Sequence, residues 1–442
     1  GLDAVFANLE RVGVSAITTN TRVAQPSDSG ERFPDLHIDG YERILDRPLW
    51  GQRELRMAKY PAFPSDPALY EGLPYRPPPH QRISGIDYDT PLKILAEATR
   101  RGWEAHLQFH PLIPPGLRPE DQPVRIDGSI PRPPQVALSG CPNNPTVQAY
   151  GLALLEDLLR SMESLDGIFL DWAEWPAYQL TDHFACFCPH CQVKAEALGY
   201  DWAVITHDVR SLWDRLHALN AGQLETVNNL LSNPSRLLEL LLHFPGWLDL
   251  LRFKAASVTA FYQMVRVRLD QLGRHKVQLS ARGWAPPWNR SSGTDYRALA
   301  DICNVLTPKL FFFDYAVLPR WYGQTLLEWN PGLSESTVLD TLVSVLNLPD
   351  SVKHRRFANY HMAGPEVPHH VDLHVYRERV DEVHDQVSGR AKLYPYLHAY
   401  LPAQQWKKLL ALMLDSKMEG AWVHMYGYLS DEKLEILRTM WH

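Results

Sequence analysis

The sequence has few cysteines and no long apolar run. Only five of its 442 residues are cysteine, too few and too clustered for a small secreted domain held together by disulfides. No stretch reaches the roughly 20 apolar residues that a membrane-spanning helix needs, and no secretory leader is visible at the N-terminus. We therefore expect no membrane partner, and the unpaired, clustered cysteines favour a cytoplasmic location.

The sequence also lacks the patterns that bind polyanions and nucleotides. There are 44 basic and 51 acidic residues, a net charge of −7, and no long basic run, which argues against nucleic acid as a partner. Neither G-x-G-x-x-G nor G-x-x-x-x-G-K-[ST] follows any predicted strand, so a nucleotide site has no local support. The 45% hydrophobic content is instead typical of a globular protein with a core.

Tryptophan and tyrosine are abundant, with 14 and 19 copies. Such rings dominate protein cores in any case. They also bind sugars, because the apolar face of a pyranose stacks on an aromatic ring while its hydroxyl groups seek polar partners. Composition alone favours packing, and the sugar interpretation needs support from the position of individual residues.

Short apolar runs alternate with helical patterns along the chain, which indicates a mostly parallel sheet. We predict strands at 14–19, 104–110, 136–138, 167–170, 276–281, 302–306 or 310–313, 392–396 and 420–426, with an extra strand at 356–361. About eight strands suit a single (β/α)8 barrel spanning residues 1–442, and a doubly wound open sheet is the rival. The proline-rich and aromatic range 23–88 predicts an ordered insertion over the barrel mouth, and 200–272 predicts a helical insertion.

The chain is most distinctive at Asp171, which ends the apolar run 167–170. Trp172, Glu174 and Trp175 follow it directly. Active sites of parallel α/β barrels lie at the carboxyl ends of their strands. Asp171 could instead cap a turn or pair with an arginine, and Glu174 could simply face solvent.

Other polar and aromatic side chains fall near the ends of predicted strands, where a barrel would gather them on one rim. As substrate-binding residues we predict Trp172, Trp175, His110, Arg282, Trp284, Tyr315, His424 and Tyr426. Convergent carboxyl groups and aromatic rings are typical of glycoside hydrolysis, in which one carboxyl group protonates the leaving oxygen and the other attacks or activates water.

The segments CPNNPTVQAYGLALLEDLLRSMESLDGIFLDWAEWP and CFCPHC resemble a glycoside hydrolase-like TIM-barrel family distantly similar to α-L-fucosidases. The resemblance implies that Asp171 is the nucleophile of a retaining glycosidase that requires no cofactor. For the acid/base we favour Glu174, because flanking tryptophans would raise its pKa. Asp314 is the second candidate, followed by Glu328 and Glu366.

Three clustered cysteines, Cys186, Cys188 and Cys191, predict a structural zinc site with His183 or His190 as the fourth ligand. The alternative is reduced thiols packed beneath a loop.

Two further functions stay open. The first is a non-catalytic barrel that binds carbohydrate. The second is a metal-dependent hydrolase with His110, His424 and Asp171 as ligands, although no H-x-H or H-E-x-x-H motif supports it. The sequence leaves a homo-oligomer open.

Overall fold

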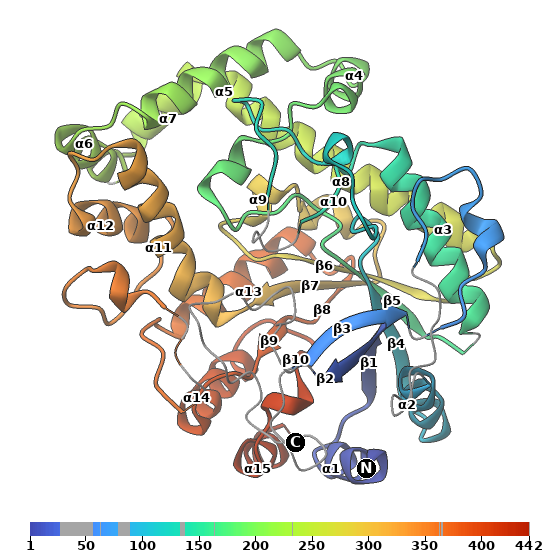
Figure 1. Ribbon diagram of the computed structural model, residues 1–442. Helices are drawn as coiled ribbons and strands as arrows, with labels where there is room; N and C mark the ends of the chain where they lie inside the picture. Colours follow the sequence, from blue (N-terminus) through green and yellow to red (C-terminus); the bar gives the residue numbers. More distant parts are fainter. Residues whose placement is uncertain are drawn as a thin grey trace.

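A parallel sheet forms the centre of the computed structural model, and helices surround it (Figure 1). The structure describes residues 1–26, 56–61, 63–77, 89–132, 138–162, 164–231, 233–361, 363 and 366–441. Hydrogen-bonded neighbours follow one another in chain order: β1 (Ala16–Asn20), β4 (Glu104–Phe109), β5 (Gly167–Asp171), β6 (Gln278–Trp284), β7 (Val305–Leu310), β9 (Tyr396–His398) and β10 (Trp422–His424). Every pairing in this sheet is parallel.

The predicted parallel α/β architecture is confirmed, whereas the strand count differs from the prediction. A two-residue strand, β8 (Lys392–Leu393), pairs with the start of β7, and β9 pairs with its end. The two occupy one position in the sheet, with Pro395 between them, where the chain lacks a backbone N–H to continue the ladder. The described strands therefore fill seven positions rather than eight, and none of their ladders joins β10 to β1.

Each strand of the sheet has one face toward the helices and one toward the interior, because successive side chains point to opposite sides. On β5, Ile168 and Leu170 belong to the large core shared with the helices. Phe169 instead joins a separate interior cluster with Tyr396 and Trp422. Its ring centroid lies 4.8 Å from that of Trp422, which brings β10 at one edge of the sheet close to β5 in its middle. The sheet therefore curls strongly, and Asp171 continues the interior face above Phe169.

Gly167 begins β5 where the interior has no room for a side chain. A Cβ atom there would lie 2.2 Å from the Nδ1 atom of His106 on β4. We expect Gly167→Ala to lower the free energy of unfolding by about 1–3 kcal/mol, because overpacking a filled interior displaces its neighbours. Gly222→Ala is the matched control, since the nearest atom to a Cβ there is 3.5 Å away. Denaturant unfolding would measure both; equal stability of Gly167→Ala and wild type would contradict the packing argument.

Helices connect and cover the strands in the order expected of repeated β–α units. They are α1 (Leu2–Arg11), α2 (Thr90–Arg100), α3 (Pro145–Ser161), α4 (Pro189–Ala197), α5 (Trp202–Leu216), α6 (Ala221–Leu231), α7 (Pro234–His243), α8 (Pro245–Gln271), α9 (Asn289–Ser292), α10 (Tyr296–Leu299), α11 (Phe312–Trp329), α12 (Glu335–Val345), α13 (His374–Val387), α14 (Ala403–Leu414) and α15 (Asp431–Met440). Short 3-10 turns are η1 (Pro67–Tyr70), η2 (Pro119–Asp121), η3 (Leu180–Phe184), η4 (Phe357–Asn359) and η5 (Tyr426–Tyr428). Across the described residues, none of the helices is long and apolar enough to cross a bilayer.

The range 23–88 contains more regular structure than its composition suggests. An antiparallel ribbon pairs β2 (Arg22–Pro26) with β3 (Arg56–Pro61), next to the end of β1 (Figure 1). Beyond it, the hydroxyl groups of Ser65 and Tyr70 donate to the buried carboxylate of Asp157 on α3. Residues 27–55 and 78–88 lie outside the described part, so the cover over the barrel mouth stays a prediction.

Two smaller secondary-structure predictions can be compared with the structure. The range 200–272 contains α5, α6, α7 and all of α8. The extra strand predicted at 356–361 is wrong, because this segment forms the single turn η4. Most of the strand predicted at 136–138 lies outside the described residues.

Candidate active site

Asp171 lies at the carboxyl end of β5 on the interior face of the sheet. Its Oδ1 atom is 2.8 Å from the ammonium of Lys309 on β7 and accepts the backbone N–H of Trp172 at 3.0 Å. Its Oδ2 atom accepts the side-chain N–H of Gln108 on β4 at 2.6 Å. The side chain of Asp171 is therefore held by neighbours from two other strands.

Two more cationic or ionisable groups face the same carboxylate. A guanidinium nitrogen of Arg282 on β6 lies 3.6 Å from Oδ2, and Nε2 of His110 lies 3.8 Å from it. Burial alone would raise the pKa of Asp171, but Lys309, His110 and Arg282 outweigh it and hold this pKa well below its usual range. Asp171 is thus a carboxylate at any physiological pH.

Lys309 connects Asp171 to a second carboxyl group. Its ammonium, 2% exposed, also lies 3.5 Å from Oε1 of Glu174. Because one ammonium contacts both groups, these two oxygens are at most roughly 6 Å apart, an upper bound compatible with the separation of about 5–5.5 Å found in retaining glycosidases. Burial favours loss of the lysine charge, but the two carboxylates prevail and raise the pKa of Lys309.

Glu174 belongs to the loop after β5 and is packed beneath β6. Its Oε2 atom accepts hydrogen bonds from the backbone N–H of Trp284 at 3.3 Å and from the hydroxyl groups of Ser292 (3.1 Å) and Thr294. The absence of a side chain at Gly283 leaves space for the Glu174 carboxyl group, because a Cβ atom at this position would lie 3.3 Å from Oε2. Burial nevertheless outweighs these donors and Lys309, and the pKa of Glu174 is raised. The pKa of Asp171 is therefore lowered and that of Glu174 is raised relative to ordinary carboxyl groups.

Trp172 has a backbone conformation that side-chain-bearing residues rarely adopt, with φ at +52°. For a bulky residue this region is a true outlier, and such strain gathers at functional sites. The strained turn places the partly exposed indole beside His110, at 5.0 Å between ring centroids, and within 5.8 Å of the Lys309 ammonium. An aromatic surface therefore stands next to the Asp171 carboxylate.

The carboxyl end of β10 contributes further partly exposed groups. The Nδ1 atom of His424 is hydrogen bonded to the Tyr396 hydroxyl at 2.7 Å, and the Tyr426 hydroxyl accepts from Asn8 at 2.9 Å. Burial and nearby Arg282 lower the pKa of His424 to about 3, so its imidazole is neutral at physiological pH. Neutral imidazole and phenol groups are suited to hydrogen bonding with sugar hydroxyls.

Three aromatic residues predicted to bind substrate are core residues here. The side chains of Trp175, Trp284 and Tyr315 are each at most 1% exposed. The Trp284 ring packs edge-on against Tyr178, and that of Tyr315 packs edge-on against Trp288. The three residues lie near strand ends as predicted, but their rings are buried in the protein.

The other predicted acids lie in different surroundings. Asp314 is in the first turn of α11 and is buried, and its Oδ1 atom has no hydrogen-bond partner within the described structure. Burial raises the pKa of Asp314 well above its usual range. Glu328 and Glu366 are exposed.

Lys309 and Gln108 are the contacts that the sequence-based site omits. Both lie inside strands, on the interior face, whereas the predicted site consists mainly of residues just after a strand. The alternation of side chains along a strand predicts these positions. Gln108 points to the same side of β4 as His106, and Lys309 points to the same side of β7 as buried Thr307. A lysine in a buried strand requires a charged partner.

The predicted cysteine cluster has a different fourth member. Cys141 lies with Cys186, Cys188 and Cys191, and the four sulfur atoms are within 4.8 Å of one another. His183 instead bonds the Tyr322 hydroxyl, and His190 is exposed. Among the described residues, these cysteines are the one group of three or more metal-ligating side chains close enough to share an ion. The proposed set of His110, His424 and Asp171 therefore has no support from the geometry.

Comparisons with known proteins found no matching family model and no match among curated proteins. Among solved structures, the glycoside hydrolase domain of PgaB (BpsB) from Bordetella bronchiseptica is similar over 99% of this chain and 91% of that one, at 10% identity and a TM-score of 0.49. The catalytic domain of a beta-amylase from Paenibacillus polymyxa covers 81% of this chain and 86% of its own, at 9% identity and a TM-score of 0.38. At these scores the functional argument rests on the side chains of the site, and the similarity to α-L-fucosidases stays a prediction.

A cavity of about 610 Å³ lies away from Asp171, at the amino ends of the strands. It is lined by polar residues that precede β7, β8 and β10, among them Asn304, Arg390 and Glu419. Because catalytic groups of parallel barrels gather at the opposite end, we do not assign this cavity to the site.

Proposed function

We propose that the protein is a retaining glycoside hydrolase in which Asp171 is the nucleophile and Glu174 the acid/base. One observation carries the proposal: two carboxyl groups share one ammonium, yet the pKa of Asp171 is lowered and that of Glu174 is raised. A nucleophile must be ionised and a general acid protonated at the same pH, and glycosidases achieve this by giving their two carboxyl groups different environments.

The reaction would proceed in two steps that use only these side chains. The Asp171 carboxylate attacks the anomeric carbon while Glu174 donates its proton to the departing glycosidic oxygen, which leaves a glycosyl ester on Asp171. Glu174, now a carboxylate, removes a proton from water, and the resulting hydroxide equivalent cleaves the ester. Lys309 and Arg282 keep Asp171 anionic before the attack and stabilise it again as it leaves.

A carbohydrate substrate also fits the side chains around Asp171. The partly exposed ring of Trp172 offers a stacking surface, and His110, His424 and Tyr426 offer hydrogen-bonding groups. Contact between Trp422 and the rings of His106 and Phe169 supports closure of the sheet into a barrel, which would set these groups around one mouth.

A carbohydrate-binding barrel without catalysis is the second candidate. The observation that favours it is the environment of Glu174, which is 3% exposed and accepts three hydrogen bonds on one oxygen. A carboxyl group so engaged could serve to hold β6 against the loop after β5. The two candidates are separated by whether any glycoside is turned over.

The test is a panel of aryl and alkyl glycosides offered to wild type and Glu174→Gln. We expect Glu174→Gln to lower kcat/KM about 10²–10⁴-fold for poor leaving groups and far less for nitrophenols, which depart without a proton. Wild-type kcat/KM should fall as pH rises through the raised pKa of Glu174, because the acid form is lost. That basic limb should be absent from the variant.

Asp314→Asn is the matched comparison, because Asp314 is an equally buried acid with a raised pKa. If Asp314→Asn rather than Glu174→Gln shows the leaving-group dependence, the acid/base is Asp314. If wild type binds sugars but cleaves none of the panel, the non-catalytic barrel replaces the hydrolase.

A further inference from the structure

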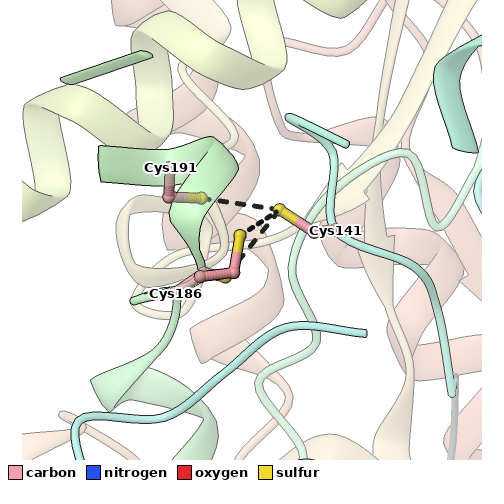
Figure 2. A group of neighbouring side chains, drawn as sticks. Cys141, Cys186 and Cys191 are labelled. Atoms are coloured by element: carbon pink, nitrogen blue, oxygen red, sulfur yellow. Dashed lines mark hydrogen bonds between the residues drawn. The ribbon is translucent and has the colours of Figure 1, made fainter. Parts of the chain in front are cut away.

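Four buried cysteines from two separate segments meet beside the loop that follows β5. Cys141 precedes α3, whereas Cys186 and Cys188 precede α4 and Cys191 lies in its first turn. All four side chains are at most 2% exposed. Figure 2 shows the sulfur of Cys141 directed at those of Cys186 and Cys191.

The spacing of the sulfur atoms matches a metal site and not disulfides. The Sγ atom of Cys141 lies 3.4 Å from that of Cys191, 3.6 Å from that of Cys188 and 3.8 Å from that of Cys186. Bonded sulfurs would be about 2.05 Å apart. Four thiolates around one zinc ion, each at about 2.3 Å, form a tetrahedron whose edges are about 3.8 Å. The three distances from Cys141 are close to this edge length, and the remaining pairs of sulfur atoms lie within 4.8 Å of one another.

Hydrogen-bond donors are directed at these sulfurs in the way that thiolate ligands require. The backbone N–H of Val124 donates to Cys186, and that of Asn143 donates to Cys141. The side-chain amide of Asn143 donates to Cys191 at 3.3 Å. Donors of this kind orient metal ligands and stabilise their negative charge. Neutral thiols packed beneath a loop have no need of three directed N–H groups.

A buried cation further offsets the charge of such a centre. Lys254 on α8 is 0% exposed; burial lowers its pKa to about 8, and Cys186, Asp182 and Cys191 are the neighbouring groups that oppose this shift. One zinc ion with four thiolates carries two net negative charges, which a neighbouring ammonium would stabilise in a site closed to water.

We propose that Cys141, Cys186, Cys188 and Cys191 bind one structural zinc ion. Its binding displaces the protons of the thiols, up to four per ion, and leaves no position for substrate or water. The centre ties the segment before α3 to the segment before α4. These segments follow β4 and β5, so the ion fixes two loops at the carboxyl end of the sheet. The proposal does not depend on the protein being a hydrolase.

The first experiment measures metal in the 442-residue chain, produced with zinc in the medium and purified without chelators. We expect about one zinc per chain in wild type and less than about 0.2 in Cys141→Ser and Cys191→Ser, because a structural site needs all four ligands. Cys303→Ser is the matched control, since Cys303 is also a buried free thiol but lies outside the cluster; it should retain its zinc.

A second measurement uses wild type alone, so that misfolded variants do not decide the outcome. An organomercurial should release one zinc to a chromophoric chelator as four thiols are consumed, and removal of zinc should lower Tm by roughly 5–10 °C. Cobalt in place of zinc should give the strong absorption of a tetrahedral thiolate site. A metal-free wild type with freely reactive thiols, a disulfide among the four cysteines, or iron bound in place of zinc would overturn the proposal.

Discussion

Replacing Asp171 with Asn is expected to lower kcat by at least about 10³–10⁴-fold on any glycoside that wild type cleaves. The amide has the shape of the carboxylate but cannot form the glycosyl ester. It also removes the anion that Lys309 and Arg282 hold in place. Because Glu174 keeps its hydrogen bonds to β6 in this variant, substrate binding should change much less than turnover.

Rescue of turnover by azide distinguishes a nucleophile from a carboxylate that only supports the fold. Asp171→Gly supplied with azide should recover turnover and give a glycosyl azide of inverted anomeric configuration, as expected when a small anion attacks in place of the missing group. Asp208→Asn is the control, because Asp208 is a buried carboxylate on α5 that only accepts hydrogen bonds from neighbouring groups. If Asp171→Asn retains wild-type kcat, the proposed nucleophile is wrong.

The position of Asp171 could be predicted from the sequence because one local pattern defines it. An apolar run bounded by Gly167 and ended by an acid predicts a buried strand with a polar terminus, and β5 has these bounds. What could not be predicted locally is which groups face that acid. Lys309 lies 138 positions away in sequence number, and only the parallel order of β5, β6 and β7 brings it near.

Cys141 illustrates the same limit for the metal site. The spacing of Cys186, Cys188 and Cys191 identifies a ligand cluster from neighbouring residues alone. The fourth sulfur belongs to Cys141, which lies before α3 and 45 positions before Cys186, so sequence spacing alone does not bring it to the cluster. The position of an aromatic residue at a strand end does not say which way its ring points, and the Trp284 ring is buried.

Removing the shared cation should have the largest effect on stability. We expect Lys309→Met to lower the free energy of unfolding by about 3–5 kcal/mol, because it leaves two buried carboxyl groups without their common partner. Combining it with Asp171→Asn should return part of this loss, since the carboxylate that most needs the ammonium is then neutral. Additive losses in the double variant would contradict a direct interaction between the two side chains.

The pH dependence of stability should reverse in Lys309→Met. In wild type the folded-state pKa of Asp171 is lowered, so its contribution is present above the unfolded value of about 3.9 and is lost as pH falls through the folded value. Without Lys309, we expect burial, the largest single influence on this carboxyl group, to outweigh Arg282 and His110 and to raise the pKa of Asp171. The folded variant then binds protons more readily than the unfolded chain, so it should gain stability relative to wild type as pH falls from 7 toward 5. Thermal unfolding at several pH values measures this difference; parallel curves for the two proteins would mean that Arg282 and His110, rather than Lys309, keep Asp171 ionised.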